Sequence, residues 1–235
     1  MHHEPKYLYL LLSLLTAIAL TTSATPRSLF SILGVLIAAL SLVVTAYLLT
    51  DRRQYWLLTL LLGAAASLPF VWASLYLETL DPRVAMGFYV LNLGCWLLFT
   101  CYSGLLIFRS LLTARRIGSN TIYRAIVVYL LIGILFAEVF QGLLVWQPGA
   151  LYFDPSRFSG PQVIGGRLAI HSTGDILYYS FVTLGTVGYG DVTPSSPVAR
   201  AVSLLEAVTG IMYVATMIAR FVAIQISSES YGGDP

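Results

Sequence analysis

Six long apolar stretches, separated by short polar segments, restrict the fold of this chain more than any other feature. A helix needs about 20 apolar residues to cross a bilayer. Only 10% of the 235 residues are charged and 57% are hydrophobic, whereas a soluble domain has about 25% charged residues. The sequence predicts an all-α membrane protein and argues against a soluble enzyme, a disordered chain or a nucleic-acid-binding protein. The six predicted spans are 7–22, 28–50, 55–79, 84–112, 121–147 and 197–226.

The basic residues are distributed unevenly between the two sides of the predicted membrane domain. With a cytoplasmic N-terminus, eight of the 13 Lys and Arg residues fall on the inner side and five on the outer side. Lys and Arg are enriched in cytoplasmic loops. The bias predicts a multi-pass membrane protein with both termini in the cytoplasm. The first stretch, from Lys6 to Ser23, also fits a cleaved signal peptide.

The longest connection, residues 148–196, lies between the fifth and sixth spans and contains the most specific motif. Residues 186–191 read Thr-Val-Gly-Tyr-Gly-Asp. Glycine reaches positive φ values without a steric penalty, so Gly188 and Gly190 allow successive carbonyls to point to the same side. The motif resembles the potassium-channel selectivity filter. Over about 121–226 the chain is similar to the two-helix pore module of bacterial potassium channels.

The resemblance implies a homotetramer in the plasma (inner) membrane, in which backbone carbonyls replace the water around a K⁺ ion. The expected K⁺ ligands are the carbonyl oxygens of Thr186, Val187, Gly188 and Tyr189, with Gly190 completing the filter. Asp191 is expected at the outer mouth. The expected supporting residues on the preceding segment are Tyr178, Tyr179 and Thr183.

Residues 174–185 are too short to span a bilayer and resemble a re-entrant pore helix followed by an extended filter loop. Ser172 and Asp175 have the spacing of a capping box, with Asp in place of Glu. The chain is thus expected to combine six membrane helices with one such pore helix.

The sixth span carries two features of the inner helix of such channels. Gly210 lies twenty-one residues after Tyr189, the place of a hinge glycine in the simple two-helix bacterial channels; the alternative is a packing glycine. Ile211, Val214 and Ile218 share one helical face. By resemblance this face lines the cavity, and the alternative is that it faces lipid.

Two acids, Glu138 and Glu206, lie deep inside predicted spans, each about 13 Å from the outer end of its helix. A charge at mid-bilayer costs at least about 2.5–3.5 kcal/mol. Each carboxyl is therefore expected to face protein and to have a hydrogen-bond partner, such as Ser180 or Thr183 of the pore helix. One interpretation is structural, and the other is proton sensing.

Residues 1–116 precede the pore module (121–226) in the position of a voltage sensor, and 227–235 form a short cytoplasmic tail. Residues 86–108 contain no charge, although a voltage sensor needs several charges in the membrane field, so strong voltage gating is not expected. The sequence shows no catalytic triad, metal-ligand cluster or nucleotide loop. We therefore do not expect an enzyme, and we expect no cofactor beyond the permeant K⁺.

These features together predict a passive, potassium-selective channel. A less selective cation channel is an alternative, because Gly185 stands where many relatives have a second Thr. A potassium transporter subunit is another, although such chains carry four filter-like repeats and this one carries a single motif. A non-conducting membrane scaffold would have little use for Gly188 and Gly190.

Overall fold

The structure is a computed structural model. It describes residues 6–23, 33, 35–40, 42–44, 53–76, 82–114, 118–158, 162–164, 168–170 and 172–231.

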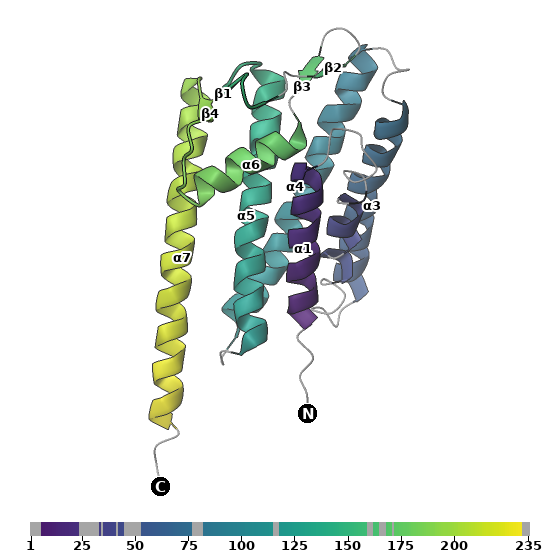
Figure 1. The fold of residues 1–235 in the computed structure, drawn as a ribbon. Coiled ribbons are helices and arrows are strands. Elements are labelled where there is room, and N and C mark those ends of the chain that lie inside the picture. The colour runs from purple at the N-terminus through teal and green to yellow at the C-terminus, as the bar shows by residue number, and fades with distance from the viewer. Residues whose placement is uncertain are drawn as a thin grey trace.

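Within the described residues, five long helices run alongside one another (Figure 1). They are α1 (Lys6–Ser23), α3 (Arg53–Tyr76), α4 (Pro82–Leu112), α5 (Ser119–Trp146) and α7 (Pro197–Tyr231). Along the chain α3 packs on α4 and α4 on α5, while α1 packs on α5 and on the short helix α6 (Thr173–Leu184). The start of α1 and the end of α7 lie at the same end of the molecule. The largest core cluster includes Leu14, Phe99 and Leu131.

Three helices are long and apolar enough to cross a membrane within the described part of the chain: Arg83–Leu112, Ser119–Trp146 and Pro197–Ile226. They correspond to the fourth, fifth and sixth predicted spans. The apolar helical segments Tyr7–Thr22 and Leu57–Pro69 are shorter. Most of the second predicted span, 28–50, falls outside the described residues. The fold is therefore mostly helical. Three of the six predicted spans are helices of spanning length within the described residues.

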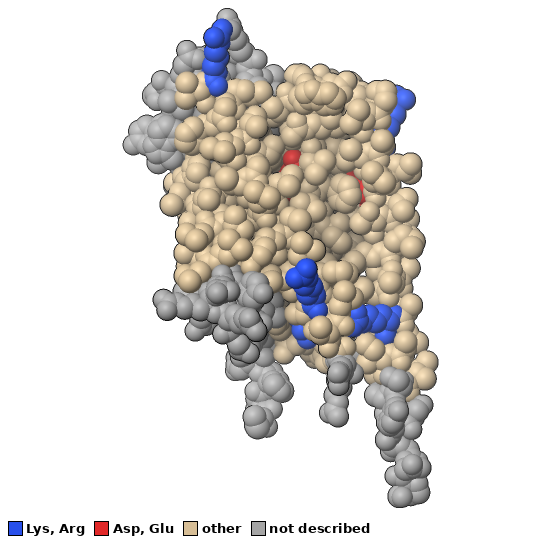
Figure 2. All heavy atoms as spheres, turned by 180° about the vertical axis from the view of Figure 1, so that it is seen from behind, with Lys and Arg blue, Asp and Glu red and all other residues tan. Residues whose placement is uncertain are grey.

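The surface agrees with a membrane location. Figure 2 shows the molecule from behind. A broad central band on this face has no Lys or Arg, and the basic side chains lie toward the two ends of the molecule. At one end, Arg124 of α5 donates a hydrogen bond to the Ser110 carbonyl at 3.0 Å. Its guanidinium also lies 5.0 Å from the centre of the Tyr7 ring. Arg220 of α7 donates to the Leu112 carbonyl. These bonds satisfy carbonyls at the end of α4, which have no partner within the helix.

The long connection between α5 and α7 contains four short strands that sequence patterns did not predict. β1 (Leu151–Phe153) pairs antiparallel with β4 (Val192–Pro194), and Tyr152 lies opposite Thr193. β2 (Gln162–Ile164) pairs with β3 (Leu168–Ile170). Strands of three residues are too short for an alternating pattern to be recognised. The β1–β4 pair joins the end of α5 to the segment just before α7.

Helix α6 crosses obliquely between α1 and α7 (Figure 1). Ser172 caps the helix, because its hydroxyl accepts a hydrogen bond from the Gly174 amide at 3.2 Å, whereas the predicted capping box would pair it with Asp175. Gly174 also allows α1 to approach closely, since a Cβ at this position would lie 2.6 Å from the Thr21 carbonyl oxygen. After α6 the chain returns to the end from which it entered, as expected for a re-entrant segment.

Candidate functional site

The backbone that follows α6 alternates in the sign of φ. Gly185 ends the helix, with φ −77° and its amide bonded to the Phe181 carbonyl. The next residues with positive φ are Thr186 (56°), Gly188 (59°) and Gly190 (79°), and the residues between them do not share this conformation. Alternation of this kind allows successive carbonyl oxygens to project to one side of the chain. The positive φ values of the two glycines match the expectation from the sequence.

Thr186 is the residue of this segment whose conformation the sequence did not indicate. A β-branched residue is rarely found at positive φ, and such a conformation costs on the order of 1–3 kcal/mol. Two hydrogen bonds hold the start of the segment in place: the Thr186 amide donates to the Thr183 carbonyl at 3.0 Å, and the Val187 amide donates to the Val182 carbonyl at 2.9 Å. The end of α6 therefore fixes the conformation.

The segment 185–190 is exposed in the single chain. Val187 is 54% exposed and Tyr189 is 67% exposed. The Tyr189 ring stacks on the Tyr178 ring, with centres 6.4 Å apart and an interplanar angle of 1°. An apolar, exposed segment with defined geometry is typical of a surface that another chain covers.

Asp191 anchors the far end of the segment. Its carboxyl is buried and accepts hydrogen bonds from the Tyr178 hydroxyl at 2.6 Å and from the Val192 amide at 3.0 Å. Arg157 lies 3.8 Å from the same carboxyl. The ordinary pKa of a tyrosine is about 10, so the Tyr178 hydroxyl is protonated at physiological pH and donates this bond to Asp191.

Tyr179 faces the long helices of its own chain, and its expected role in supporting the segment 186–191 stays a prediction. Its hydroxyl lies 2.6 Å from the Ser203 hydroxyl of α7, and its ring packs edge-on against Phe140 of α5. It therefore ties α6 to the two long helices beside it. Tyr178, its neighbour on α6, faces the segment 186–191. The two side chains diverge because successive helix residues point about 100° apart.

The two buried acids have different surroundings. Glu206 is fully buried, and its Oε1 lies 2.5 Å from the Ser180 hydroxyl of α6, as the sequence predicted. The same hydroxyl lies 2.7 Å from the Gly133 carbonyl of α5, so three helices meet at one side chain. Glu138 does not bond to the pore helix as expected; Thr100 of α4 donates to its Oε1 at 2.8 Å.

Gly210 of α7 lies directly against the end of α6. A Cβ at this position would be 2.4 Å from the Leu184 carbonyl oxygen, closer than any real contact. The Tyr129 hydroxyl of α5 donates to the same carbonyl at 3.3 Å. The glycine therefore has a packing role in this structure, the alternative to the hinge. The other three α7 residues singled out from the sequence are exposed in the single chain: Ile211, Val214 and Ile218.

Comparison with known proteins assigns the C-terminal part of the chain. Residues 143–226 match the family model described as "Ion channel". This segment is similar to ion-channel pore domains. Over 61 residues, 33% are identical to the protein named "Two pore potassium channel c" of Oryza sativa subsp. japonica, and the matched region is 26% of this chain and 13% of that protein. The region that matches the ion-channel model contains α6, the extended segment and α7.

Proposed function

We propose that four copies of this chain form a potassium-selective channel that conducts K⁺ passively. The observation that carries this proposal is the alternating φ of the exposed segment 186–190 inside the region that matches the ion-channel model. Its Thr-Val-Gly-Tyr-Gly sequence is that of potassium filters. The name of the rice relative supports potassium as the permeant ion.

The need for several chains follows from the coordination of the ion. A dehydrated K⁺ requires oxygen ligands around it, and one extended strand offers carbonyls from one side only. Fourfold repetition would place rings of oxygen from Thr186, Val187, Gly188 and Tyr189 around a common axis. The exposed apolar side chains of α7 provide surface for such contacts and for lipid. They include Leu204, Leu205, Val208, Ile211, Met212 and Ile218.

Helix α6 would support the ion electrostatically. Its C-terminal end, near Leu184, comes just before the filter segment. The C-terminus of a helix carries a partial negative charge equivalent to roughly half an elementary charge. In a fourfold assembly, four such ends would face the axis and favour a cation below the filter.

The N-terminal part, residues 1–116, is proposed as a support for the pore rather than as a voltage sensor. Helix α4 packs along α5, and no charged residue lies between Arg83 and Arg109. In the proposed orientation both termini, including the tail 227–235, lie in the cytoplasm of a bacterial-type cell.

Planar-bilayer recording of the purified chain tests the proposal directly. K⁺ is supplied at different concentrations on the two sides, and Na⁺ balances the charge. We expect the reversal potential to shift by about 59 mV for each tenfold change in the K⁺ ratio. A reversal potential that stays at zero would instead indicate the less selective cation channel. Unit currents too small to resolve, with slow tracer uptake, would favour a transporter subunit.

Glu206 is proposed to make conduction sensitive to pH. The Ser180 hydroxyl has one proton to donate. When Glu206 is neutral, the Glu206 carboxyl donates to Ser180 and Ser180 donates to the Gly133 carbonyl. When Glu206 is charged, Ser180 donates to Glu206 instead and the Gly133 carbonyl loses this bond. We expect the open probability of the wild type to change between about pH 5 and pH 9, the range in which buried carboxyls titrate.

Glu206→Gln should keep the neutral arrangement at every pH and flatten this profile in single-channel recordings. Glu138→Gln is the matched control, because Glu138 bonds to Thr100 and not to the pore helix. A Glu206→Gln channel with the wild-type pH profile would remove proton sensing from Glu206.

A further inference from the structure

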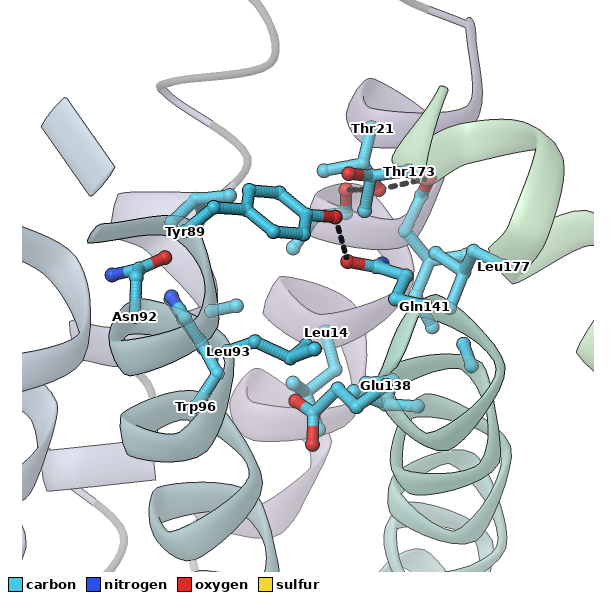
Figure 3. Close-up of a pocket in the computed structure, with 16 residues that line it drawn as sticks. Leu14, Thr21, Tyr89, Asn92, Leu93, Trp96, Glu138, Gln141, Thr173 and Leu177 are labelled. Carbon is cyan, nitrogen blue, oxygen red and sulfur yellow. Dashed lines mark hydrogen bonds between the residues drawn. The ribbon is translucent and has the colours of Figure 1, made fainter. Parts of the chain in front are cut away.

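A cavity of about 140 Å³ lies outside the ion-conduction site, where α1, α4 and α5 meet the start of α6. Its walls are mainly apolar, with Leu14 of α1, Leu93 and Trp96 of α4 and Leu177 of α6 among them (Figure 3). A cavity of about 150 Å³ in another protein holds one benzene molecule. The space therefore suits a ligand with a single ring or a short branched chain.

One polar group in this cavity is buried without a complete set of partners. Glu138 is 6% exposed. Its Oε1 accepts from Thr100, but its Oε2 has no hydrogen-bond partner among the described residues. An unpaired buried polar atom costs about 1–3 kcal/mol and more when it is charged. A group that donates a hydrogen bond to Oε2 would recover this energy.

Among the described residues, no polar group of the cavity supplies that donor. The Tyr89 hydroxyl donates to Gln141 Oε1 at 3.3 Å, and the Asn92 amide donates to the Ala66 carbonyl at 2.8 Å. Figure 3 shows Glu138 and Gln141 extending from the same helix into the space beside α4. None of the described residues that line the cavity is Lys, Arg or His, so its walls provide no positive charge for the carboxyl.

From this combination we propose that the cavity binds a small apolar amine, whose ring or alkyl group fills the space and whose ammonium group donates to the Glu138 carboxyl, which turns its buried Oε2 toward the ligand. An ammonium–carboxylate pair has no net charge, and a charge-assisted hydrogen bond is about twice as strong as a neutral one. An alcohol of the same shape would fill the cavity but lack the ionic partner. The ligand would contact α1, α4 and the pore helix at once.

Benzylamine and benzyl alcohol are suitable probes, because they have almost the same shape and differ in charge. Binding to the full chain in lipid nanodiscs can be measured by calorimetry and by the fluorescence of Trp96, which lines the cavity. We expect the wild type to bind benzylamine at least about tenfold more tightly than benzyl alcohol, a difference of about 1.4 kcal/mol. Equal affinities, or no saturable binding of benzylamine, would overturn the proposal.

Two variants locate the site. Glu138→Gln should reduce benzylamine affinity at least about tenfold, to that of the alcohol, and leave alcohol binding unchanged. Asp154→Asn, which removes a carboxyl from the loop after β1, is the control and should change neither. Ala17→Leu retains Glu138 but fills part of the cavity, so it should abolish binding of both probes.

The outcomes remain decisive if Glu138→Gln does not fold, because the amine–alcohol comparison and Ala17→Leu do not depend on it. Benzylamine binding that survives in Ala17→Leu, or that Glu138→Gln leaves unchanged, would place the ligand elsewhere. None of these measurements requires ion conduction, so they are independent of the proposed function.

Discussion

Gly188→Ala is expected to abolish potassium-selective current while the assembled protein keeps its size in detergent. Gly188 has φ 59°, and a Cβ in this left-handed region costs about 1–2 kcal/mol per residue. In the proposed tetramer this cost would arise four times, once in each chain, at the same level of the pore. Space is not the reason, because nothing lies within 4 Å of the added Cβ in the single chain. The loss would come from the backbone turning its carbonyls away from the ion.

Thr186 shows that a residue with a side chain can hold positive φ in this segment when hydrogen bonds fix its backbone. It holds a side chain at φ 56°, but its amide and the amide of Val187 are bonded to the end of α6. Gly188 is bonded more weakly, at 3.4 Å to the Val182 carbonyl, so an alanine there can relax to negative φ. Relaxation would break the alternation that lets carbonyls share one side.

Gly94→Ala is the matched control for Gly188→Ala. It makes the same chemical change in helix α4, where the added Cβ also meets nothing within 4 Å and φ is not positive. Reversal potentials in mixed K⁺ and Na⁺ should be normal for Gly94→Ala and lost for Gly188→Ala. A Gly188→Ala channel that still prefers K⁺ would count against a carbonyl filter in this segment.

The sequence predicted those parts of the structure that depend on short-range rules. Apolar length and flanking polar residues gave the positions of α4, α5 and α7 close to their observed bounds, and the cap at Ser172 marked the start of α6. Ser180, the observed partner of Glu206, was among the predicted candidates, because residues at similar depths on neighbouring helices are brought within reach of each other.

The parts that were missed depend on which helices become neighbours. Glu138 was expected to face the pore helix, but the packing of α4 along α5 gives it Thr100 as partner. The contact of α1 with α5 and α6 has no local signal, since an apolar helix in lipid shows little preference among its faces. The β1–β4 pair joins residues far apart in sequence, and Thr186 carries no residue-type signal for positive φ.

Gly210→Ala separates the two interpretations of this glycine by a large effect on stability. The added Cβ would lie 2.4 Å from the Leu184 carbonyl oxygen and 3.0 Å from Leu184 Cδ1. A backbone carbonyl cannot move aside alone, so α7 and the end of α6 must separate. Overpacking of this kind costs about 1–3 kcal/mol in each chain. The thermal midpoint of the assembled protein should fall, and the conducting fraction with it.

Gly142→Ala is the control for Gly210→Ala, because its added Cβ would lie 3.5 Å from Leu93 Cδ2, an ordinary contact. A pure hinge would give the opposite pattern: Gly210→Ala would retain wild-type thermal stability and alter only the open probability. The contact with Leu184 argues for packing, since that carbonyl lies at the end of α6, directly before the segment 186–190. Displacing it would also disturb Thr186 and Val187, whose amides depend on the last turn of α6. Loss of stability together with loss of selectivity is therefore the expected result.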